Sequence, residues 1–168
     1  MNLILIGYRG TGKTSVAKIL ALRLHSKLIS TDEEIVMREK MRIPEIVEMY
    51  GWNYFRDAES EVIKEISRED DCIIDAGGGV VLREENIKNL RRNGKIVLLY
   101  AEVNTIAVRI KDDTQRPSLT GKKTFIDEIE DVLKERNPLY EKSADFSVDT
   151  TNLTVEEVVE RIIEYLKR

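Results

Sequence analysis

The sequence predicts a three-layer α/β fold, in which helices cover both faces of a five-stranded parallel sheet. Short apolar runs alternate along the chain with longer segments of helical periodicity, which is the pattern of successive strand–helix–strand units. The run Lys95–Tyr100 is almost continuously apolar, as expected for a strand that is buried on both faces. Because 42% of the 168 residues are hydrophobic, we expect one domain with its own core over residues 1–168.

The first strand is the apolar run Leu3–Ile6, and the segment Gly7–Thr14 follows it directly. This segment fits the phosphate-binding loop (P-loop) pattern of Gly, four free positions and Gly-Lys-Thr. Apolar residues at near-helical spacing from Val16 to Leu24 supply the helix that must follow. The glycines let backbone N–H groups converge on phosphate oxygens at the helix N-terminus. The segment therefore predicts a nucleotide triphosphate site, and the alternative is a Gly-rich turn without a ligand.

Within this loop, Lys13 is expected to reach the outer phosphates, and the Thr14 hydroxyl is placed to bind Mg²⁺. A dinucleotide-binding fingerprint is excluded, because the glycines do not follow the spacing G-x-G-x-x-G. The candidate nucleotide-binding residues of the segment are Gly10, Thr11, Gly12, Lys13, Thr14 and Ser15.

Two acidic residues stand at the carboxyl ends of predicted strands, where open α/β sheets bind their ligands. Asp32 follows the short strand Leu28–Ser30, and its alternative role is the N-cap of a helix from Glu33 onward. Asp75 ends a strand that begins at Cys72, and it is a candidate Mg²⁺ partner of the Walker B kind. The alternative for Asp75 is a residue that starts a turn.

Three consecutive glycines, Gly77, Gly78 and Gly79, come shortly after Asp75. Glycine loses more backbone entropy on folding than any other residue. We therefore expect this run at a tight turn or at a close approach of a ligand.

Two helices are expected between these strands. The first begins at Ile43-Pro44, with proline at the first helical position, and ends at Gly51 as a C-terminal cap. The second covers residues 52–66 and carries Arg56 early in its length. A cation is unfavourable near a helix N-terminus, which hints at an anionic partner for Arg56, but a solvated surface arginine is the default expectation.

The second half of the chain continues the alternation of helices and strands. We expect helices over Glu85–Arg92, Asn104–Ile110, Phe125 to about Glu135, and Val155–Leu166, and strands over Lys95–Tyr100 and Phe146–Val148. Pro138 is expected to kink or restart the helix before it. Thr154 and Glu157 form a capping box at the start of the last helix.

The segment Lys111–Lys123 is polar, lacks periodicity and contains both Pro117 and Gly121. A loop of this length inside a compact domain usually has a function, often as a lid. Arg116 lies in its middle. We expect a lid over about residues 111–124.

Composition excludes several classes of protein. A formal net charge of −4 and a pI of about 5.3 argue against binding of nucleic acid through a basic face. No run of 18 apolar residues could span a membrane, and a strand that starts within three residues of Met1 leaves no room for a signal peptide. Cys72 is the only cysteine, which excludes a disulfide framework and predicts a buried small hydrophobe. We therefore expect a cytoplasmic protein.

A P-loop alone does not separate kinases from GTPases, ATPases or nucleotide sensors. The absence of an Asn-Lys-x-Asp sequence counts against a GTPase. Arg56, Arg116 and Arg136 are well separated along the chain. Together with the lid, they suit a small-molecule phosphotransferase that closes over an anionic acceptor and excludes water.

Taken in chain order, the motifs resemble those of the shikimate kinase family. They are the P-loop, Thr31-Asp32, Phe55-Arg56 with Glu59, Gly77-Gly78-Gly79, Arg116-Pro117-Ser118-Leu119 and Arg136-x-Pro-Leu-Tyr140. The resemblance extends from residue 1 to the last helix. It implies the nucleoside monophosphate kinase fold, with strand order 2-3-1-4-5, a lid and a substrate-binding helical region of about residues 32–61. The implied activity is transfer of the γ-phosphoryl group of ATP, with Mg²⁺, to the 3-hydroxyl of shikimate.

The resemblance also implies roles for single residues on the shikimate side. Asp32 matches the carboxylate that hydrogen-bonds the shikimate hydroxyls and takes the proton of the attacking one. Arg56 and Arg136 match the pair that holds the substrate carboxylate, with Gly78 as a backbone contact beside it. Such a pair is sensible, because the planar guanidinium matches a carboxylate.

On the nucleotide side, Arg116 matches the lid arginine that closes onto the transferred phosphoryl group. Arg109 matches an arginine that flanks the adenine, where a guanidinium can stack on a base. The turn around Asp149-Thr150 and Asn152 matches the loop that closes over the other side of the adenine.

The sequence departs from the family pattern at two positions. Ser30 stands where the family usually has an aspartate near Mg²⁺, and Asp75 stands where a small residue is common. We hypothesise that Asp75, through water, takes part of the metal role that Ser30 cannot fill.

Two alternative functions remain at this point. One is a kinase of the same fold that acts on another small polyol acid, such as gluconate. The other is a regulatory module that binds a nucleotide without catalysis, although Lys13, Asp32 and Arg116 favour an enzyme. A monomer is the default expectation.

Overall fold

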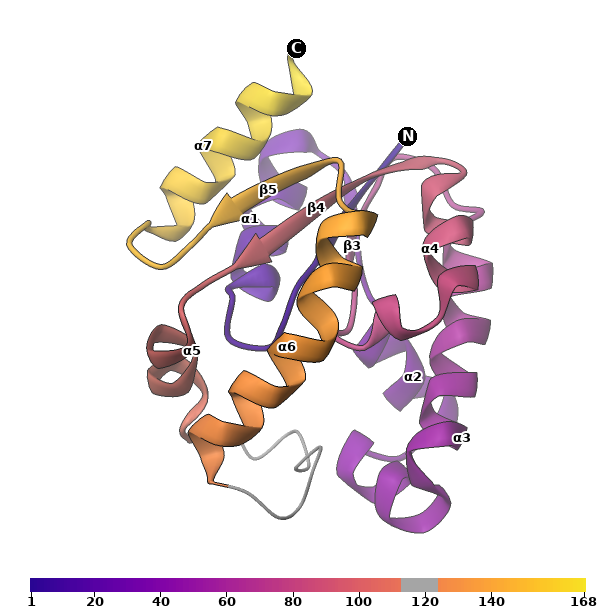
Figure 1. The fold of residues 1–168 in the computed structure, drawn as a ribbon. Helices are drawn as coiled ribbons and strands as arrows, with labels where there is room; N and C mark the ends of the chain where they lie inside the picture. Colours follow the sequence, from indigo (N-terminus) through magenta and orange to yellow (C-terminus); the bar gives the residue numbers. More distant parts are fainter. Residues whose placement is uncertain (113–123) are drawn as a thin grey trace.

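The computed structural model describes residues 1–112 and 124–168 of the chain, and Figure 1 shows its ribbon. Over these residues the backbone forms a sheet of five parallel strands in the order β2-β3-β1-β4-β5. The strands are β1 (Asn2–Ile6), β2 (Lys27–Ser30), β3 (Cys72–Asp75), β4 (Gly94–Tyr100) and β5 (Phe146–Asp149). The predicted fold class and strand order are confirmed.

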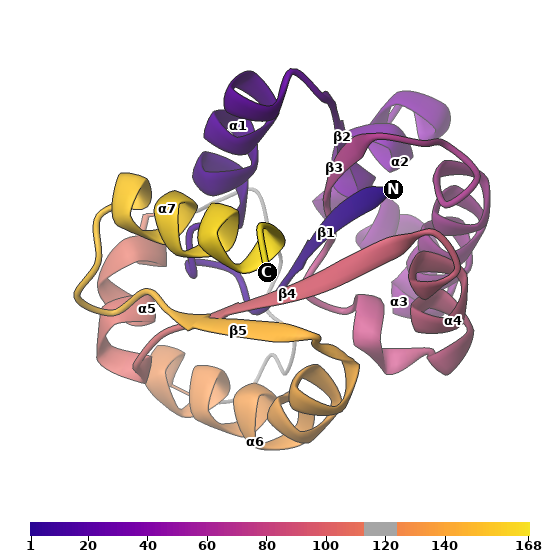
Figure 2. The same ribbon diagram turned by 90° about the horizontal axis from the view of Figure 1, so that it is seen from above.

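Helices cover both faces of this sheet. They are α1 (Lys13–Leu24), α2 (Thr31–Glu39), α3 (Ile43–Ile66), the short 3-10 helix η1 (Val80–Leu82), α4 (Glu84–Arg91), α5 (Val103–Ile110), α6 (Phe125–Ser143) and α7 (Val155–Leu166). Figure 2 shows α1 and α7 on one face of the sheet and α3, α4 and α6 on the other. The fold therefore has the three predicted layers.

The central strand β1 explains why the first apolar run is continuous. Its side chains alternate, so Leu3 and Leu5 join the core beneath α1 and α7, whereas Ile4 and Ile6 join the core beneath α3, α4 and α6. All four are 4% exposed or less. A strand covered on both faces needs an apolar side chain at every position.

The carboxyl ends of β1, β2 and β3 meet at one edge of the sheet. The strand register aligns Leu5 with Asp75, and Asp75 with Ser30. From this edge the chain enters the P-loop after β1, α2 after β2, and the glycine run after β3. Segments that are far apart in the sequence thus come together where ligands of parallel sheets bind.

The helix after β2 begins at Thr31 rather than at Glu33. Its N-cap is Ser30, whose hydroxyl oxygen accepts a hydrogen bond from the Glu33 backbone N–H over 3.4 Å. The N-cap alternative for Asp32 is therefore wrong. Asp32 lies in the first turn of α2, where a carboxylate is favourable with the helix dipole.

The prediction that a helix ends near Glu135 is also wrong, since α6 continues through Pro138 to Ser143. Val132, Arg136 and Tyr140 recur at helical spacing, and all three are buried. Packing of this buried stripe offsets the hydrogen bond that the proline nitrogen cannot donate.

The break predicted at Gly51 is present inside α3. Gly51 has φ 85° and ψ 170°, which separates the helix into two segments that match the two predicted helices. Pro44 lies in the first turn, as expected.

The part of the chain outside residues 113–123 contains no helix with the length and apolar character needed to cross a bilayer. Most of the predicted lid, including Arg116, falls outside the described residues.

Candidate active site

The P-loop joins β1 to α1 through a backbone that favours glycine. Gly7, Gly10 and Gly12 have φ values of 140°, 81° and 92°. At Gly7 a Cβ would also lie 2.1 Å from the Leu99 carbonyl oxygen on β4, so no side chain fits there. Gly12 is the N-cap of α1 and provides no side-chain cap, which leaves the first N–H groups of the helix for an anionic ligand.

Lys13 and Thr14 begin α1 and carry the polar groups of the loop. The Lys13 Nζ donates to the carbonyl oxygens of Gly7, over 2.8 Å, and Tyr8, over 3.0 Å. The Thr14 hydroxyl donates to Asp75 Oδ2 over 2.6 Å. A cation and a hydroxyl therefore stand beside the N–H groups at the helix start, which is the set of groups that a phosphate chain requires.

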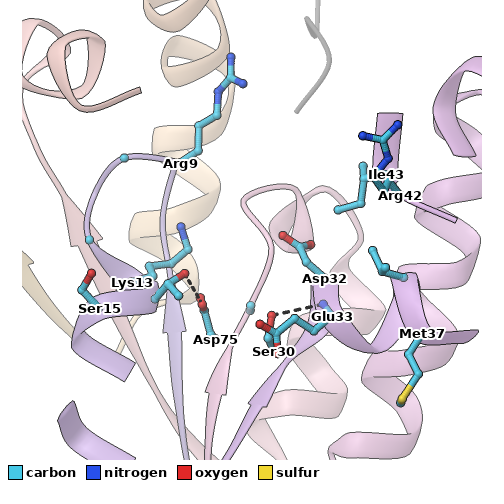
Figure 3. A pocket seen from close by; sticks show the side chains of 15 residues that line it. Arg9, Lys13, Ser15, Ser30, Asp32, Glu33, Met37, Arg42, Ile43 and Asp75 are labelled. Carbon is cyan, nitrogen blue, oxygen red and sulfur yellow. Dashed lines mark hydrogen bonds between the residues drawn. The ribbon is translucent and has the colours of Figure 1, made fainter. Parts of the chain in front are cut away.

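A cavity of about 700 Å³ opens beside the P-loop (Figure 3). Lys13 and Asp75 stand on one side of it, and Asp32 reaches in from α2 on the opposite side. The predicted site residues that line the cavity are Gly10, Gly12, Lys13, Thr14, Ser15, Asp32 and Asp75. Its size is in the usual range for small-molecule sites.

The oxygen donors of this cavity fit a hard divalent cation such as Mg²⁺. The Thr14 hydroxyl and the Asp75 carboxylate are within hydrogen-bond distance of each other, and Ser30 is the register neighbour of Asp75. Over residues 1–112 and 124–168, no group of three or more His, Cys, Asp or Glu side chains could hold a metal by itself. A small number of protein oxygens suits Mg²⁺, which is usually bound by one or two of them together with phosphates and water.

A second cluster lies beside the glycine run and is built around a buried ion pair. The Arg56 Nη1 lies 3.0 Å from Glu59 Oε2, one turn along α3, and their side chains are 11% and 1% exposed. Burial raises the pKa of the Glu59 carboxyl, while Arg56 and Arg136 oppose that rise. Arg56 is therefore a buried side chain with an anionic partner, and the default expectation of a solvated surface arginine is wrong.

Arg136 approaches the same cluster from α6 and is 7% exposed. Its Nη1 would lie 3.7 Å from a Cβ placed on Gly78, and the Arg56 guanidinium would lie 2.1 Å from one on Gly79. Glu59 pairs with Arg56, and Arg136 brings a second buried guanidinium to the cluster. A ligand carboxylate bound between the two arginines would offset the cost of burying them.

The glycine run allows these side chains to approach its backbone. At Gly77 a Cβ would lie 2.8 Å from Glu59 Oε1 and 2.9 Å from Asp32 Oδ1. The Gly77 N–H donates to the Thr31 hydroxyl oxygen over 2.9 Å, which fixes the run against the start of α2. Asp32 and the arginine cluster therefore lie against the same run of residues 77–79, although of these groups only Asp32 lines the cavity beside the P-loop.

Tyr140 contacts the glycine run from α6. Its hydroxyl donates to the Gly78 carbonyl oxygen over 2.5 Å, and burial raises the pKa of Tyr140 to about 12. The phenol therefore remains protonated at neutral pH and acts as a fixed donor.

Arg109 links the P-loop to the turn after β5. Its guanidinium donates to the Gly10 carbonyl oxygen over 3.1 Å, and to the hydroxyl and carbonyl oxygens of Thr150 over 3.1 and 2.9 Å. Thr150 is buried, and its hydroxyl donates to the Thr11 carbonyl oxygen over 3.0 Å. Asn152 is exposed two residues further on. The residues expected around the adenine thus lie on α5 and in the turn after β5. Arg109 joins this turn to the P-loop through its hydrogen bonds.

Sequence reasoning did not identify every residue of the site. Thr150 appeared only as part of a turn, although it is a hydrogen-bonding centre between two loops. Arg9, Val36, Met37 and Arg42 also line the cavity. Arg9 occupies a free position of the P-loop pattern, and the other three lie on α2 or at the start of α3, where no motif marks them.

A model of the shikimate kinase family matches residues 9–167 of the chain. The chain belongs to the shikimate kinase family. A shikimate kinase of Thermodesulfovibrio yellowstonii is 46% identical over 167 residues, which cover 99% of this chain and 95% of the relative. One from Caldicellulosiruptor bescii is 42% identical over 163 residues, which cover 96% and 93%.

Solved shikimate kinase structures have the same fold. The shikimate kinase of Acinetobacter baumannii, in complex with shikimate, has a TM-score of 0.93 and 30% identity, covering 98% of this chain and 92% of that one. The shikimate kinase of Aquifex aeolicus has a TM-score of 0.86 and 34% identity, covering 99% and 96%. The predicted family, fold class and kinase activity are therefore confirmed, and the chain is an ATP-using phosphotransferase of the shikimate pathway.

Proposed function

We propose that this chain transfers the γ-phosphoryl group of ATP to the 3-hydroxyl of shikimate, giving shikimate 3-phosphate and ADP on the route to the aromatic amino acids. The observation that carries the proposal is the buried pair of Arg56 and Arg136, which lies beside the glycine run at the same sheet edge as the P-loop. A cationic acceptor pocket next to a phosphate-binding loop suits transfer to a small carboxylate.

On the nucleotide side, the N–H groups of residues 10–15 and the Lys13 ammonium bind the phosphates. They stabilise the negative charge that spreads over the equatorial oxygens during transfer. Arg109 and Asn152 flank the adenine, and Arg116 closes onto the transferred group. The role proposed for Arg109 is supported by its hydrogen bonds to both the P-loop and Thr150.

On the acceptor side, Arg56 and Arg136 hold the shikimate carboxylate, and Gly77, Gly78 and Gly79 let the ring approach the backbone. Asp32 hydrogen-bonds the hydroxyls and takes the proton of the 3-hydroxyl while the new O–P bond forms and the bond to the ADP leaving oxygen breaks. The support for Asp32 is its position across the cavity from Lys13.

Mg²⁺ is proposed to be held by the Thr14 hydroxyl and, through water, by Asp75. When bound, this ion would neutralise phosphate charge. Asp75 and Ser30 are register partners on adjacent strands, which supports the idea that Asp75 supplies the carboxylate that Ser30 lacks.

We expect Asp75→Asn to raise the Mg²⁺ concentration needed for half-maximal turnover about tenfold, because an amide is a weaker ligand than a carboxylate. The measurement is a Mg²⁺ titration of initial rate at saturating ATP and shikimate. Asp71→Asn, which removes an exposed carboxylate directly before the same strand β3, is the matched control. An unchanged titration curve for Asp75→Asn would remove Asp75 from the metal site.

We expect Gly79→Ala to raise KM for shikimate about tenfold and to leave KM for ATP nearly unchanged. The new Cβ would lie 2.1 Å from the Arg56 guanidinium, which must move away from the position where it binds the carboxylate. Because the displacement also separates Arg56 from the buried Glu59, the thermal midpoint should fall as well, and the difference between the two KM values carries the test. Equal KM values for shikimate in both proteins would contradict the assignment of Arg56.

A coupled ADP-release assay with ATP and Mg²⁺ tests the proposed acceptor. Shikimate, gluconate and no acceptor are compared. We expect ADP release that depends on shikimate and is lost in Arg136→Ala. ADP release with gluconate alone would show that the acceptor is gluconate rather than shikimate. No ADP release with any acceptor would favour the regulatory module.

We further propose that residues 1–168 act as one kinase domain, with acceptor-binding helices over about residues 32–61 and a lid over about 111–124. The protein is proposed to be a cytoplasmic monomer that binds neither nucleic acid nor membrane. The net charge of −4 supports the absence of a nucleic-acid partner.

A further inference from the structure

Arg9 is the third residue of the P-loop, yet its side chain does not point toward the centre of the cavity. Figure 3 shows the Arg9 guanidinium directed away from Lys13 and Asp75. Its Nη2 lies 3.7 Å from Glu128 Oε1, in the first turn of α6. Arg9 therefore connects the nucleotide-binding loop to a helix of a different part of the site.

The pair formed by Arg9 and Glu128 is largely removed from water. The two side chains are 16% and 7% exposed, and the Arg9 guanidinium lies 5.9 Å from the ring centre of Tyr8. A carboxylate buried to this extent is costly unless a cation stands near it. The position of the first turn of α6 is thus linked to the position of the P-loop.

The same helix carries Arg136. Glu128, Val132, Arg136 and Tyr140 follow one another at intervals of four residues, which places them along one side of α6. All four residues are buried, each of them 7% exposed or less. Glu128 contacts the P-loop at one end of this stripe, and Tyr140 donates to the Gly78 carbonyl oxygen at the other.

We propose that Arg9 and Glu128 are a positioning pair, which sets α6 against the P-loop and thereby sets Arg136 relative to the phosphate site. The inference rests on the proposed role of Arg136 in holding the acceptor carboxylate. Neither residue of the pair touches shikimate in this account. Their effect reaches the acceptor through the rigid helix between Glu128 and Arg136, which spans about 12 Å.

The pair has a distinct kinetic consequence. If it positions Arg136, then Glu128→Gln weakens acceptor binding while the phosphate-binding N–H groups stay in place. KM for shikimate should rise about tenfold, and KM for ATP should change by less than about twofold. A purely structural role would instead lower thermal stability without separating the two KM values.

The experiment uses the full chain and four variants: Arg9→Met, Glu128→Gln, the double variant, and the exchange of Arg9→Glu with Glu128→Arg. Glu130→Gln, which removes an exposed carboxylate from the same helix, is the control. KM for both substrates, kcat and the thermal midpoint are measured for each. We expect the double variant to raise KM for shikimate by less than the product of the single effects, and the exchange to recover part of the loss.

Each outcome decides the question. If the wild-type protein phosphorylates shikimate but the variants have the same KM values as Glu130→Gln, the positioning role of Arg9 and Glu128 is overturned. The proposed function would stand. Variants with a lower thermal midpoint and unchanged KM values would assign the pair to stability and also overturn the proposal. A wild-type protein with no shikimate-dependent turnover would remove the proposed function, and with it the role of the pair.

Discussion

Replacing Lys13 with methionine is expected to lower kcat about a thousandfold while the protein stays folded. Methionine keeps much of the length and packing of the side chain but has no charge. The Nζ lies within the P-loop, where it donates to the carbonyl oxygens of Gly7 and Tyr8. A positioned cation at the transferred phosphoryl group stabilises the transition state more than the ground state, so kcat should fall more than KM for ATP rises.

The measurement for Lys13→Met is steady-state kinetics with ATP varied at saturating shikimate. Lys18→Met, at an exposed position further along α1, is the matched control and should retain wild-type kcat. A Lys13→Met enzyme with kcat within about tenfold of wild type would show that the ammonium does not stabilise the reacting phosphates. Far-ultraviolet circular dichroism and the thermal midpoint would detect a loop that has lost its structure.

Replacing Asp32 with asparagine is expected to lower kcat by about a thousandfold, in the range that general-base catalysis contributes. Asparagine can still hydrogen-bond a substrate hydroxyl, so KM for shikimate should rise much less. The carboxylate lies in the first turn of α2 and reaches the cavity opposite Lys13 (Figure 3). This is the position from which a base can act on a hydroxyl that faces the phosphates.

The control for Asp32→Asn is Glu34→Gln, which removes a second carboxylate from the same turn of α2. It should leave kcat within about twofold of wild type. If Asp32→Asn raised KM for shikimate strongly and left kcat unchanged, Asp32 would bind the acceptor without taking its proton. The two effects are read from one series in which shikimate is varied at saturating ATP.

Much of the fold is predictable because its signals are local. The run Leu3–Ile6 is apolar at every position because β1 is covered on both faces, and the P-loop glycines match the positive φ values that the turn requires. For these residues the structural role can be inferred from the few residues next to them in the sequence. The same holds for Thr154 and Glu157, which form the predicted capping box at α7.

Other features depend on contacts between distant segments. Val132, Arg136 and Tyr140 keep helical spacing on both sides of Pro138, but the sequence does not show that the burial of this stripe compensates for the proline. Ser30 was interpreted from its missing carboxylate, whereas its hydroxyl caps α2. Thr150 became part of the site only when the fold brought it against Arg109 and Thr11. Such roles are set by the tertiary structure, and no pattern of residues in the sequence marks them.

The buried cluster beside the glycine run lies between these two cases. The position of Arg56 early in a helix hinted at an anionic partner, and Glu59 is that partner in the structure, although a solvated surface arginine was the default expectation. The depth of burial of both side chains was not predictable, because it depends on how closely residues 77–79 approach α3. Glycines at those positions allow the approach, but only the fold shows what occupies the space.

The most direct test of the central claim is the site at which the phosphate is attached to the acceptor. ATP, Mg²⁺ and shikimate are incubated with the protein, and the product is examined by phosphorus–proton correlation NMR. The account predicts one product, with phosphate on the 3-hydroxyl and one ADP formed for each shikimate consumed. Phosphate on another hydroxyl, or ADP accompanied only by inorganic phosphate, would contradict it.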